Sequence, residues 1–372
     1  MHRFSTQNLR EVFAEENKFE NFRTVASNLV RGIDTYELDE DGNERKLSKT
    51  QTNKAIRKVF MDICGLTEND LTSKKKRHRA EKAHILEIFE VIEDDVDFMI
   101  NEGFQKTEWF NDICDSRNIA LGDQNAFYVE DNQLLIVSNT SGDHHDVTIQ
   151  QAIPGREIVV KTTSHSVKIG KDIDLIILDR YDYTKMINKI AESYIKDIQN
   201  LICTNMYAAV DKLPAGAGLT MTSVLDASTK ADFDELIETV EAVNGTEVIL
   251  VGTKVALKKL TAIADVDWAS EDQKISIANT GRLGSYEGTS IMEIPQRLTT
   301  DGTFGKLISN DVILVIPVRE DKFVKFVDEG ETEIVEYSDK GDKKDDFETY
   351  EVNRNYGAEV VLGQYFGAWR KA

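Results

Sequence analysis

The sequence predicts an α+β protein with more than one domain, and three observations support this. A charge-rich, mostly helical segment spans residues 1–115, a β-rich segment follows it, and helices then alternate with strands. The 372 residues suffice for two or three domains of about 150 residues each. A chain of this length buries roughly three quarters of its unfolded surface, so its core needs no disulfide or metal.

Apolar residues at helical spacing predict two helices in the first segment. One spans Thr52–Cys64, with Ile56, Phe60 and Ile63 on its apolar face. The other spans Glu81–Phe104 and has a longer stripe, which comprises Ile85, Ile88, Phe89, Ile92, Val96, Met99 and Ile100. Before them, the polar stretch Tyr36–Lys49 contains Asp41-Gly42, which is typical of a turn or hairpin.

Short apolar stretches after residue 116 predict a long hairpin. Leu134–Val137 is one strand, and Ile158–Thr163 with Val167–Ile169 is its return partner. The polar segment Ser138–Gly155 between them is expected at the surface.

A long helix follows over Tyr183–Leu213, where apolar residues recur at spacings of three and four. Pro214 and the small residues after it end the helix. At 1.5 Å per residue its length would be about 45 Å.

Residues 231–320 predict an α/β unit. Its elements are a helix over Asp232–Val243, a strand over Glu247–Val251, a helix over Thr253–Ile263, a glycine-rich turn over Gly281–Gly288 and a strand over Val312–Ile316. The last segment returns to β structure, with strands expected over Phe323–Val327, Thr332–Tyr337 and Phe347–Phe366 and a charged hairpin loop over Ser338–Asp346.

Composition argues against several classes of protein. No apolar run approaches the roughly 20 residues that cross a bilayer, and the first ten residues contain no apolar core of a secretory signal. Cys64, Cys114 and Cys203 are widely spaced, which favours a reducing compartment over a disulfide framework. The net charge of −21 disfavours an electrostatic grip on nucleic acid or anionic lipid.

No motif predicts a phosphate site. The segment Gly245–Lys254 has the wrong spacing for a phosphate-binding loop, and a buried strand occupies it. Gly281–Gly288 precedes a strand instead of following one, so we interpret it as a turn that needs glycine. Asp143–Asp146 holds two adjacent histidines that point in different directions, which disfavours a metal site within one chain.

Other reactive groups are also predicted to be structural. Cys64 and Cys203 belong to apolar helical stripes, and Asp115 beside Cys114 disfavours a thiolate. The acidic residues Glu93–Asp97 predict a solvated helix face. For the basic run Lys74–Arg79 we favour a solvated linker or a protein contact, with nucleic acid as the open alternative. We therefore predict no catalytic residue, no cofactor and no metal.

The order of elements resembles that of HK97-type major capsid proteins of tailed bacteriophages, over residues 116–372. The segments that carry the resemblance are Gly155–Val160 with Val167–Gly170, the long helix, Glu247–Leu260, Gly281–Pro295, Ile308–Pro317 and Asn353–Gly363. None is a strict motif, and the resemblance is one of arrangement. It implies an N-terminal helical arm or added domain (1–115), a β-hairpin E-loop (116–180), a P-domain with its sheet and spine helix (181–230 and 321–372) and an α/β A-domain (231–320).

The resemblance implies a structural role and not an enzyme. Hexamers and pentamers would close into an icosahedral shell around the phage genome, with scaffold, portal and decoration proteins as further partners. The DNA would be enclosed without specific binding, no membrane would be involved, and assembly would occur in the host cytoplasm. The candidate contacts between subunits are Lys161 and Lys168 in the E-loop and Gly281, Arg282, Gly284 and Gly288 near the capsomer axis.

Simple physics agrees with assembly, because an isolated two-stranded ribbon is marginally stable in water and a symmetric assembly supplies a partner surface. Two alternatives stay open. One is an encapsulin-like compartment with the same fold. The other is an α/β enzyme whose site lies between Val251-Gly252 and the Gly281 turn.

Overall fold

The computed structural model describes two compact units, each assembled from segments that are distant in sequence. Unit 1 comprises Met1–Lys106, Thr163–Asp197 and Glu329–Asn355, and unit 2 comprises Thr107–Thr162, Ile198–Asp328 and Tyr356–Ala372. The described residues are 4–14, 18–31, 36–38, 44–105, 108–123, 125–129, 155–170, 177–178, 183–213, 218–264, 283–299, 305–318, 322–337, 349–360 and 365–371. Among these residues, no helix combines the length and the hydropathy needed to cross a membrane.

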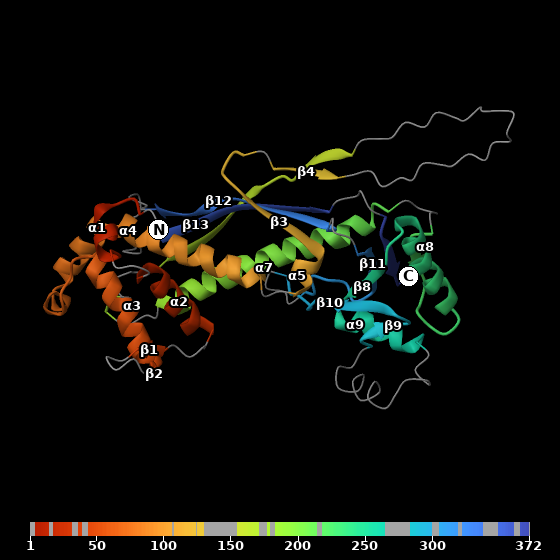
Figure 1. Cartoon of the computed structure of the whole chain (residues 1–372), viewed down its shortest axis with the longest axis horizontal. Helices are drawn as coiled ribbons and strands as arrows, with labels where there is room; N and C mark the ends of the chain where they lie inside the picture. The colour runs from red at the N-terminus through yellow and green to blue at the C-terminus, as the bar shows by residue number, and fades with distance from the viewer. Residues whose placement is uncertain are drawn as a thin grey trace. The chain divides into compact units, whose positions relative to one another are not determined.

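The N-terminal part of unit 1 is helical, as the apolar stripes predict. Its elements are α1 (Gln7–Val12), α2 (Lys18–Arg31), β1 (Tyr36–Leu38), β2 (Glu44–Lys46), α3 (Lys49–Ile63), η1 (Glu68–Thr72) and α4 (Lys74–Gln105) (Figure 1). Strands β1 and β2 pair antiparallel, which confirms the predicted hairpin. Helix α3 begins with a capping box between Ser48 and Gln51, a pair that satisfies two free N–H groups.

Aromatic rings and the predicted stripes form the core of this part. The rings of Phe13 and Phe19 pack with centroids 5.1 Å apart, and Phe22 packs on Phe60 of α3 at 6.2 Å. On α4, the stripe residues Ile88, Phe89, Ile92, Val96, Met99 and Ile100 are buried. The two predicted helices are therefore confirmed, although α4 begins at Lys74, seven residues before the predicted start.

The predicted long helix is α7 (Tyr183–Val210, 28 residues), which belongs to unit 1 up to Asp197 and to unit 2 from Ile198. A four-stranded sheet has the order β3-β12-β13-β6. Its strands are β3 (Cys114–Ile119), which follows α5 (Glu108–Ile113), β12 (Val324–Tyr337), β13 (Thr349–Val360) and β6 (Thr163–Gly170).

Three strand predictions need correction. The sequence placed Val167–Ile169 in the return strand of the hairpin, whereas this segment belongs to β6, beside β13 in the four-stranded sheet. The sequence predicted separate strands over Phe323–Val327 and Thr332–Tyr337, whereas β12 runs through both. Gly330 adopts a φ of 81°, a conformation open to glycine, so the strand continues through this residue. The partner of the return strand β5 (Arg156–Val159) is β4 (Ala126–Val129), while the predicted partner, Leu134–Val137, lies outside the described residues.

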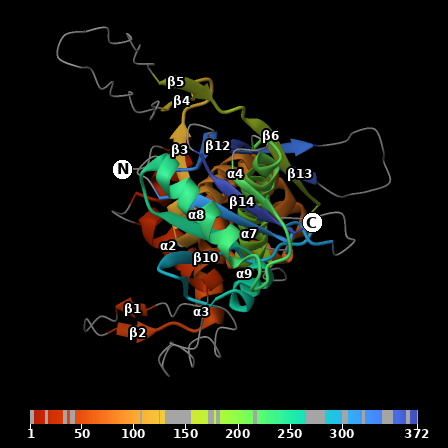
Figure 2. The ribbon, with the colours of Figure 1, turned by 90° about the vertical axis from the view of Figure 1, so that its right-hand side faces the viewer.

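Unit 2 contains a six-stranded mixed sheet of order β7-β14-β11-β8-β10-β9. The strands are β7 (Thr220–Thr222), β8 (Val248–Gly252), β9 (Ser285–Tyr286), β10 (Thr289–Glu293), β11 (Val312–Pro317) and β14 (Gly367–Arg370). Helix α8 (Lys230–Asn244) lies against β7, β11 and β14 and buries Phe233, Leu236 and Val240 there (Figure 2). Helix α9 (Lys254–Lys258) and η2 (Lys259–Ala262) follow β8. The helix over Asp232–Val243 and the strands over Glu247–Val251 and Val312–Ile316 are confirmed, whereas the predicted helix over Thr253–Ile263 is divided into α9 and η2. The sheet also takes β7 and β14 from outside residues 231–320.

Candidate functional surfaces

The β9–β10 hairpin forms the turn that the glycine-rich segment predicted. Tyr286 pairs with Thr289, so Glu287 and Gly288 are the two turn residues, with φ values of 46° and 95°. Two positive φ values are characteristic of a type I′ turn, which explains Gly288. Gly284 lies in an exposed bend with open space around its Cα. Gly281 and Arg282 lie outside the described residues.

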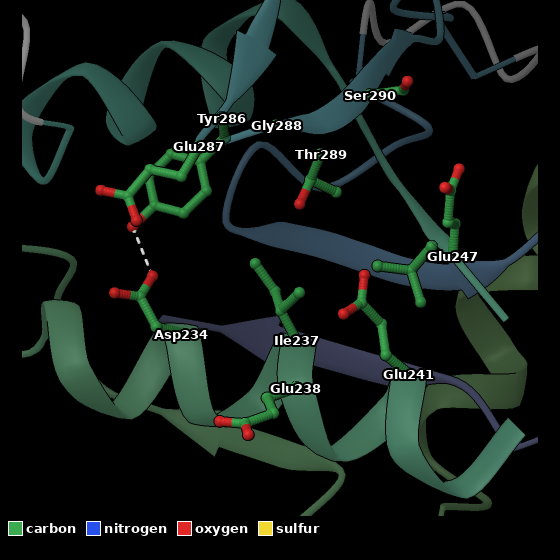
Figure 3. Close-up of a pocket in the computed structure, with 11 residues that line it drawn as sticks. Asp234, Ile237, Glu238, Glu241, Glu247, Tyr286, Glu287, Gly288, Thr289 and Ser290 are labelled. Atoms are coloured by element: carbon green, nitrogen blue, oxygen red, sulfur yellow. Dashed lines mark hydrogen bonds between the residues drawn. The ribbon is translucent and has the colours of Figure 1, made fainter. Parts of the chain in front are cut away.

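An acidic pocket of about 390 Å³ lies beside this turn, between α8 and the β9–β10 hairpin (Figure 3). Its carboxylates are Asp234, Glu238, Glu241, Glu247 and Glu287. The Tyr286 hydroxyl donates to Asp234 Oδ1 at 2.7 Å, and Lys230 pairs with Glu287. Burial, followed by the contact with Asp234, raises the pKa of Tyr286 above its usual value, so Tyr286 acts as a neutral donor.

This pocket was not predicted from the sequence, because its residues extend from position 234 to position 290. One signal was available, since Asp234, Glu238 and Glu241 are spaced by four and three and therefore share a helix face. The pocket is strongly negative. Within the ranges that the structure describes, no three His, Cys, Asp or Glu side chains are placed to hold a metal ion.

The β4–β5 ribbon has one buried face and one exposed face. Phe127 and Val129 of β4 are buried, whereas Tyr128 is 57% exposed and Val159 of β5 is 54% exposed. Ala126 pairs with Val159, so Val159 shares the exposed face with Tyr128, two residues along from Ala126. Large apolar side chains therefore lie in solvent on a ribbon of only two described strands.

The base of this ribbon is fixed by charge and by packing. Phe127 clusters with Val160 and Val327. Lys325 of β12 is only 2% exposed, and its Nζ lies 3.1 Å from Asp115 Oδ2 and 5.5 Å from the centre of the Phe127 ring. A buried ammonium needs such a counter-charge. The base of the ribbon is thus held by an ion pair and by apolar packing, whereas on the outer face the Tyr128 hydroxyl accepts the N–H of Gly155 at 3.0 Å.

The structure describes four of the six predicted contact residues. Lys161 follows β5 and has an exposed side chain, and its carbonyl oxygen packs closely on Gly357 of β13. Lys168 lies on β6, in unit 1, and is exposed. Gly284 and Gly288 share the β9–β10 hairpin, and the two lysines lie on other elements.

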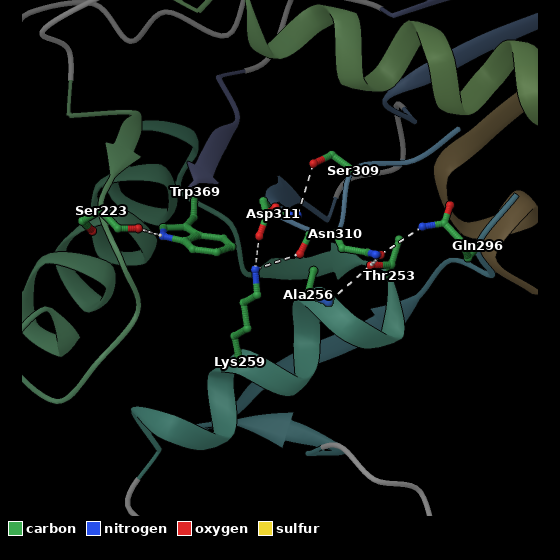
Figure 4. A network of polar contacts seen from close by, with 9 residues as sticks. All are labelled: Ser223, Thr253, Ala256, Lys259, Gln296, Ser309, Asn310, Asp311 and Trp369. Carbon is green, nitrogen blue, oxygen red and sulfur yellow. Dashed lines mark hydrogen bonds and ion pairs between the residues drawn. The ribbon is translucent and has the colours of Figure 1, made fainter. Parts of the chain in front are cut away.

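The surroundings of Gly252, the alternative enzyme site, form an internally paired network (Figure 4). Thr253 Oγ1 donates to Asn310 Oδ1 at 2.9 Å and accepts from the N–H of Ala256 as the helix cap of α9. Lys259 pairs with Asp311 and donates to the carbonyl of Asn310 at 3.0 Å. Each of these polar groups bonds to the protein, so the network joins α9 and η2 to the residues just before β11.

The cysteines are buried and unreactive in character. Burial is the main cause that raises the pKa of Cys64 and of Cys203 to about 12, and it also raises the pKa of Cys114. A buried thiol of this kind is a poor nucleophile. The predicted core positions of Cys64 and Cys203 are confirmed, and Cys114 is buried as well. The adjacent histidines His144 and His145 lie outside the described residues.

The prediction of a solvated acidic helix face over Glu93–Asp97 is wrong. Asp95 is 1% exposed, and Glu93 and Asp97 accept backbone N–H groups of β12. The prediction failed because these donors are more than two hundred residues away in sequence.

The basic run is the exposed start of α4, and not a linker before it. Lys74, Lys75 and Arg79 are exposed, while Arg77 is buried and donates to the carbonyl of Leu71. The predicted solvation is therefore confirmed for most of the run.

Comparison with known proteins defines the class as capsid proteins, because residues 22–370 match the model of a capsid-protein family. That family is described as the SPbeta prophage-derived putative capsid protein YonB, and the chain belongs to it. The resemblance to phage capsid proteins is confirmed at this level, and the role of the chain is structural. A search of curated protein sequences found no match.

Solved capsid structures are similar at low identity. The mature capsid of bacteriophage PhiM1 matches with 14% identity and a TM-score of 0.46, over 71% of this chain and 86% of that chain. The capsid of the native GTA particle matches with 11% identity and a TM-score of 0.48, over 71% and 89%. The holo-SrpI encapsulin complex of Synechococcus elongatus matches with 13% identity and a TM-score of 0.39, over 71% and 87%.

Proposed function

We propose that this capsid protein is the major shell subunit, and that it forms hexamers and pentamers that close into an icosahedral shell of the HK97 type around a phage genome. The observation that carries the proposal is the β4–β5 ribbon, whose exposed face presents Tyr128 and Val159. A ribbon of this kind gains stability when a second surface covers it. In a closed symmetric assembly, a neighbouring copy is the covering surface.

In this proposal residues 116–180 are the E-loop, residues 181–230 and 321–372 form the P-domain, and residues 231–320 are the A-domain. Residues 1–115 are an added N-terminal domain. Lys161 and Lys168 lie at contacts between subunits, and the β9–β10 hairpin with Gly284 and Gly288 gathers near the capsomer axis, together with Gly281 and Arg282. Assembly in the host cytoplasm, with scaffold, portal and decoration proteins as partners, belongs to the same proposal.

The test is the assembly state of the full chain after Tyr128→Ser and Val159→Ser are introduced together. Wild-type protein is expected to form capsomers and particles, seen by negative-stain microscopy and light scattering, and the double variant is expected to stay dissociated with unchanged far-UV circular dichroism. The control is Val255→Ser on α9, which is similarly exposed at 53% and should assemble normally.

Two outcomes would contradict the proposal: wild-type chains that stay monomeric at every concentration, or a double variant that assembles as the wild type does. The content of purified particles distinguishes a phage shell from the remaining alternative, an encapsulin-like compartment. Packaged DNA supports the phage shell, whereas a packaged enzyme favours an encapsulin-like compartment.

A further inference from the structure

Two carboxylates on α4 bind the backbone of β12, and both elements lie in unit 1 at this point. Glu93 Oε1 accepts the N–H of Ile334 at 2.6 Å. Asp97 Oδ2 accepts the N–H of Thr332 at 3.2 Å, and Asp97 Oδ1 accepts the Thr332 hydroxyl. Glu93 and Asp97 are four residues apart and therefore share one helix face, and Thr332 and Ile334 are two residues apart on the strand. The spacing of the two carboxylates along α4 thus matches the spacing of the two N–H groups along β12.

These N–H groups belong to an edge of β12 that β3 leaves open. Alternate residues of a strand direct their backbone groups to the same side, so the N–H groups of Thr332 and Ile334 point to one side of β12, where side chains of α4 and not a neighbouring strand accept them. The strand on that side is β3, which has six residues against the fourteen of β12. An open edge can pair with another chain, and here the two carboxylates occupy the place of the missing strand.

The charges around this contact are unbalanced. Arg354 of β13, which is 3% exposed, pairs with Asp97 and donates to Thr332 Oγ1 at 3.0 Å. Glu93 faces Asp94 and Asp97 on its own helix and Glu333 on β12, and all three are acidic. From α2, Arg23 donates to the backbone carbonyl of Asp94 at 3.4 Å.

Burial is the largest cause that raises the pKa of Glu93, from 4.5 to about 7, and the neighbouring carboxylates add to it, while the N–H of Ile334 opposes them. When Glu93 is bound to β12, it therefore keeps a proton that a freely solvated glutamate would release above about pH 4.5. The stabilisation that this proton gives to the contact between α4 and β12 is fully present below pH 4.5 and is lost as the pH rises through about 7. A protonated carboxyl group keeps an oxygen that accepts the Ile334 N–H.

We propose that Glu93 and Asp97 form a proton-dependent clasp, which holds α4 over the open edge of β12 when Glu93 is protonated and loosens when Glu93 ionises. Opening the clasp exposes the N–H groups of Thr332 and Ile334 to solvent. The clasp is a property of one chain and stands whether or not the ribbon contact proposed above is correct.

The test is hydrogen exchange of the Thr332 and Ile334 amides in the full chain between pH 5.5 and 8.5, corrected for the intrinsic pH dependence of exchange. In the wild type, protection should fall at least tenfold over this range. In Glu93→Gln, which keeps an oxygen acceptor but cannot ionise, protection should be independent of pH. Glu331→Gln is the matched control, because Glu331 is exposed on the same strand, and it should behave as the wild type.

Wild-type protection that does not change with pH, or a Glu93→Gln variant that loses protection as the wild type does, would overturn the clasp. If Glu93→Gln fails to fold, the Glu93 carboxyl of the wild type can be titrated directly by carbon NMR. A midpoint between about 6 and 8 supports the clasp, and a midpoint near 4.5 rejects it.

Discussion

The six-stranded sheet of unit 2 and the outer half of β12 in unit 1 are held by different forces. Every residue of β11, at the centre of the six-stranded sheet, is buried and apolar, and α8 covers the sheet with further apolar side chains. On β12, the outward N–H groups of Thr332 and Ile334 are bound by carboxylates of α4, and Arg354 is buried beside them. The first region depends on area removed from water, and the second depends on hydrogen bonds and charge. The two regions should therefore respond differently to mutation and to pH.

The largest effect on the free energy of unfolding is expected at Gly357 of β13, which packs directly on the backbone of Lys161. A Cβ atom at this position would collide with the carbonyl oxygen and carbon of Lys161, and backbone cannot move aside as a side chain does. Gly357→Val should lower the free energy of unfolding by roughly 3 kcal/mol or more, at the upper end of overpacking effects. Urea unfolding followed by circular dichroism measures this.

The control for that change is Gly284→Ala, which has open space around the new methyl group and should alter stability by less than about 0.5 kcal/mol. Equal effects of the two substitutions would contradict the close contact with Lys161.

The next effect tests the apolar region. Leu314 of β11 is fully buried, and Leu314→Ala removes core volume, so the free energy of unfolding should fall by about 2–5 kcal/mol. The loss should be the same at pH 5.5 and at pH 8.5, because no titrating group takes part. A strong pH dependence of the loss would show that the two regions are not energetically distinct.

The charged region is tested by Asp97→Asn. The substitution keeps the shape of the side chain but removes the carboxylate that pairs with the buried Arg354, and breaking a buried ion pair costs about 3 kcal/mol. Thr332 donates one hydrogen bond to each oxygen of Asp97, and asparagine keeps only one acceptor oxygen, so the loss combines the missing charge with one missing hydrogen bond. The double variant Asp97→Asn with Arg354→Met should recover part of the loss, because it also removes the positive charge that Asp97 balances. A double variant less stable than either single variant would argue against this account.

The contrast between the apolar sheet and the charged region also explains which features could be predicted from the sequence. Helix α8 and strands β8 and β11 were predicted nearly to the residue, because apolar periodicity is a local property of the chain. The strand β12 was divided in two because the φ of Gly330 depends on its structural context. The role of Glu93 was not predictable, since its partner Ile334 is 241 residues away. The acidic pocket was missed for the same reason, because helix and hairpin carboxylates meet only in the folded chain.

The smallest change in the free energy of unfolding is expected at the β9–β10 turn, where backbone strain and charge can be compared at one residue. Glu287 adopts a φ of 46°, where residues other than Gly, Asn and Asp are strained, and Asn-Gly is the preferred pair of a type I′ turn. Glu287→Asn should therefore raise the free energy of unfolding by about 0.5 kcal/mol, reduced somewhat by the loss of the half-exposed ion pair with Lys230.

Lys230→Ala isolates that ion pair, and its expected cost is below about 1 kcal/mol. If Glu287→Asn destabilises the chain by more than Lys230→Ala does, the strain assigned to the turn is wrong. If Glu287→Asn stabilises the chain, the strain at Glu287 is confirmed. The carboxylate beside the pocket is then present at a cost in stability, which indicates that the charge of this residue, and not its fit to the turn, is the property retained at position 287.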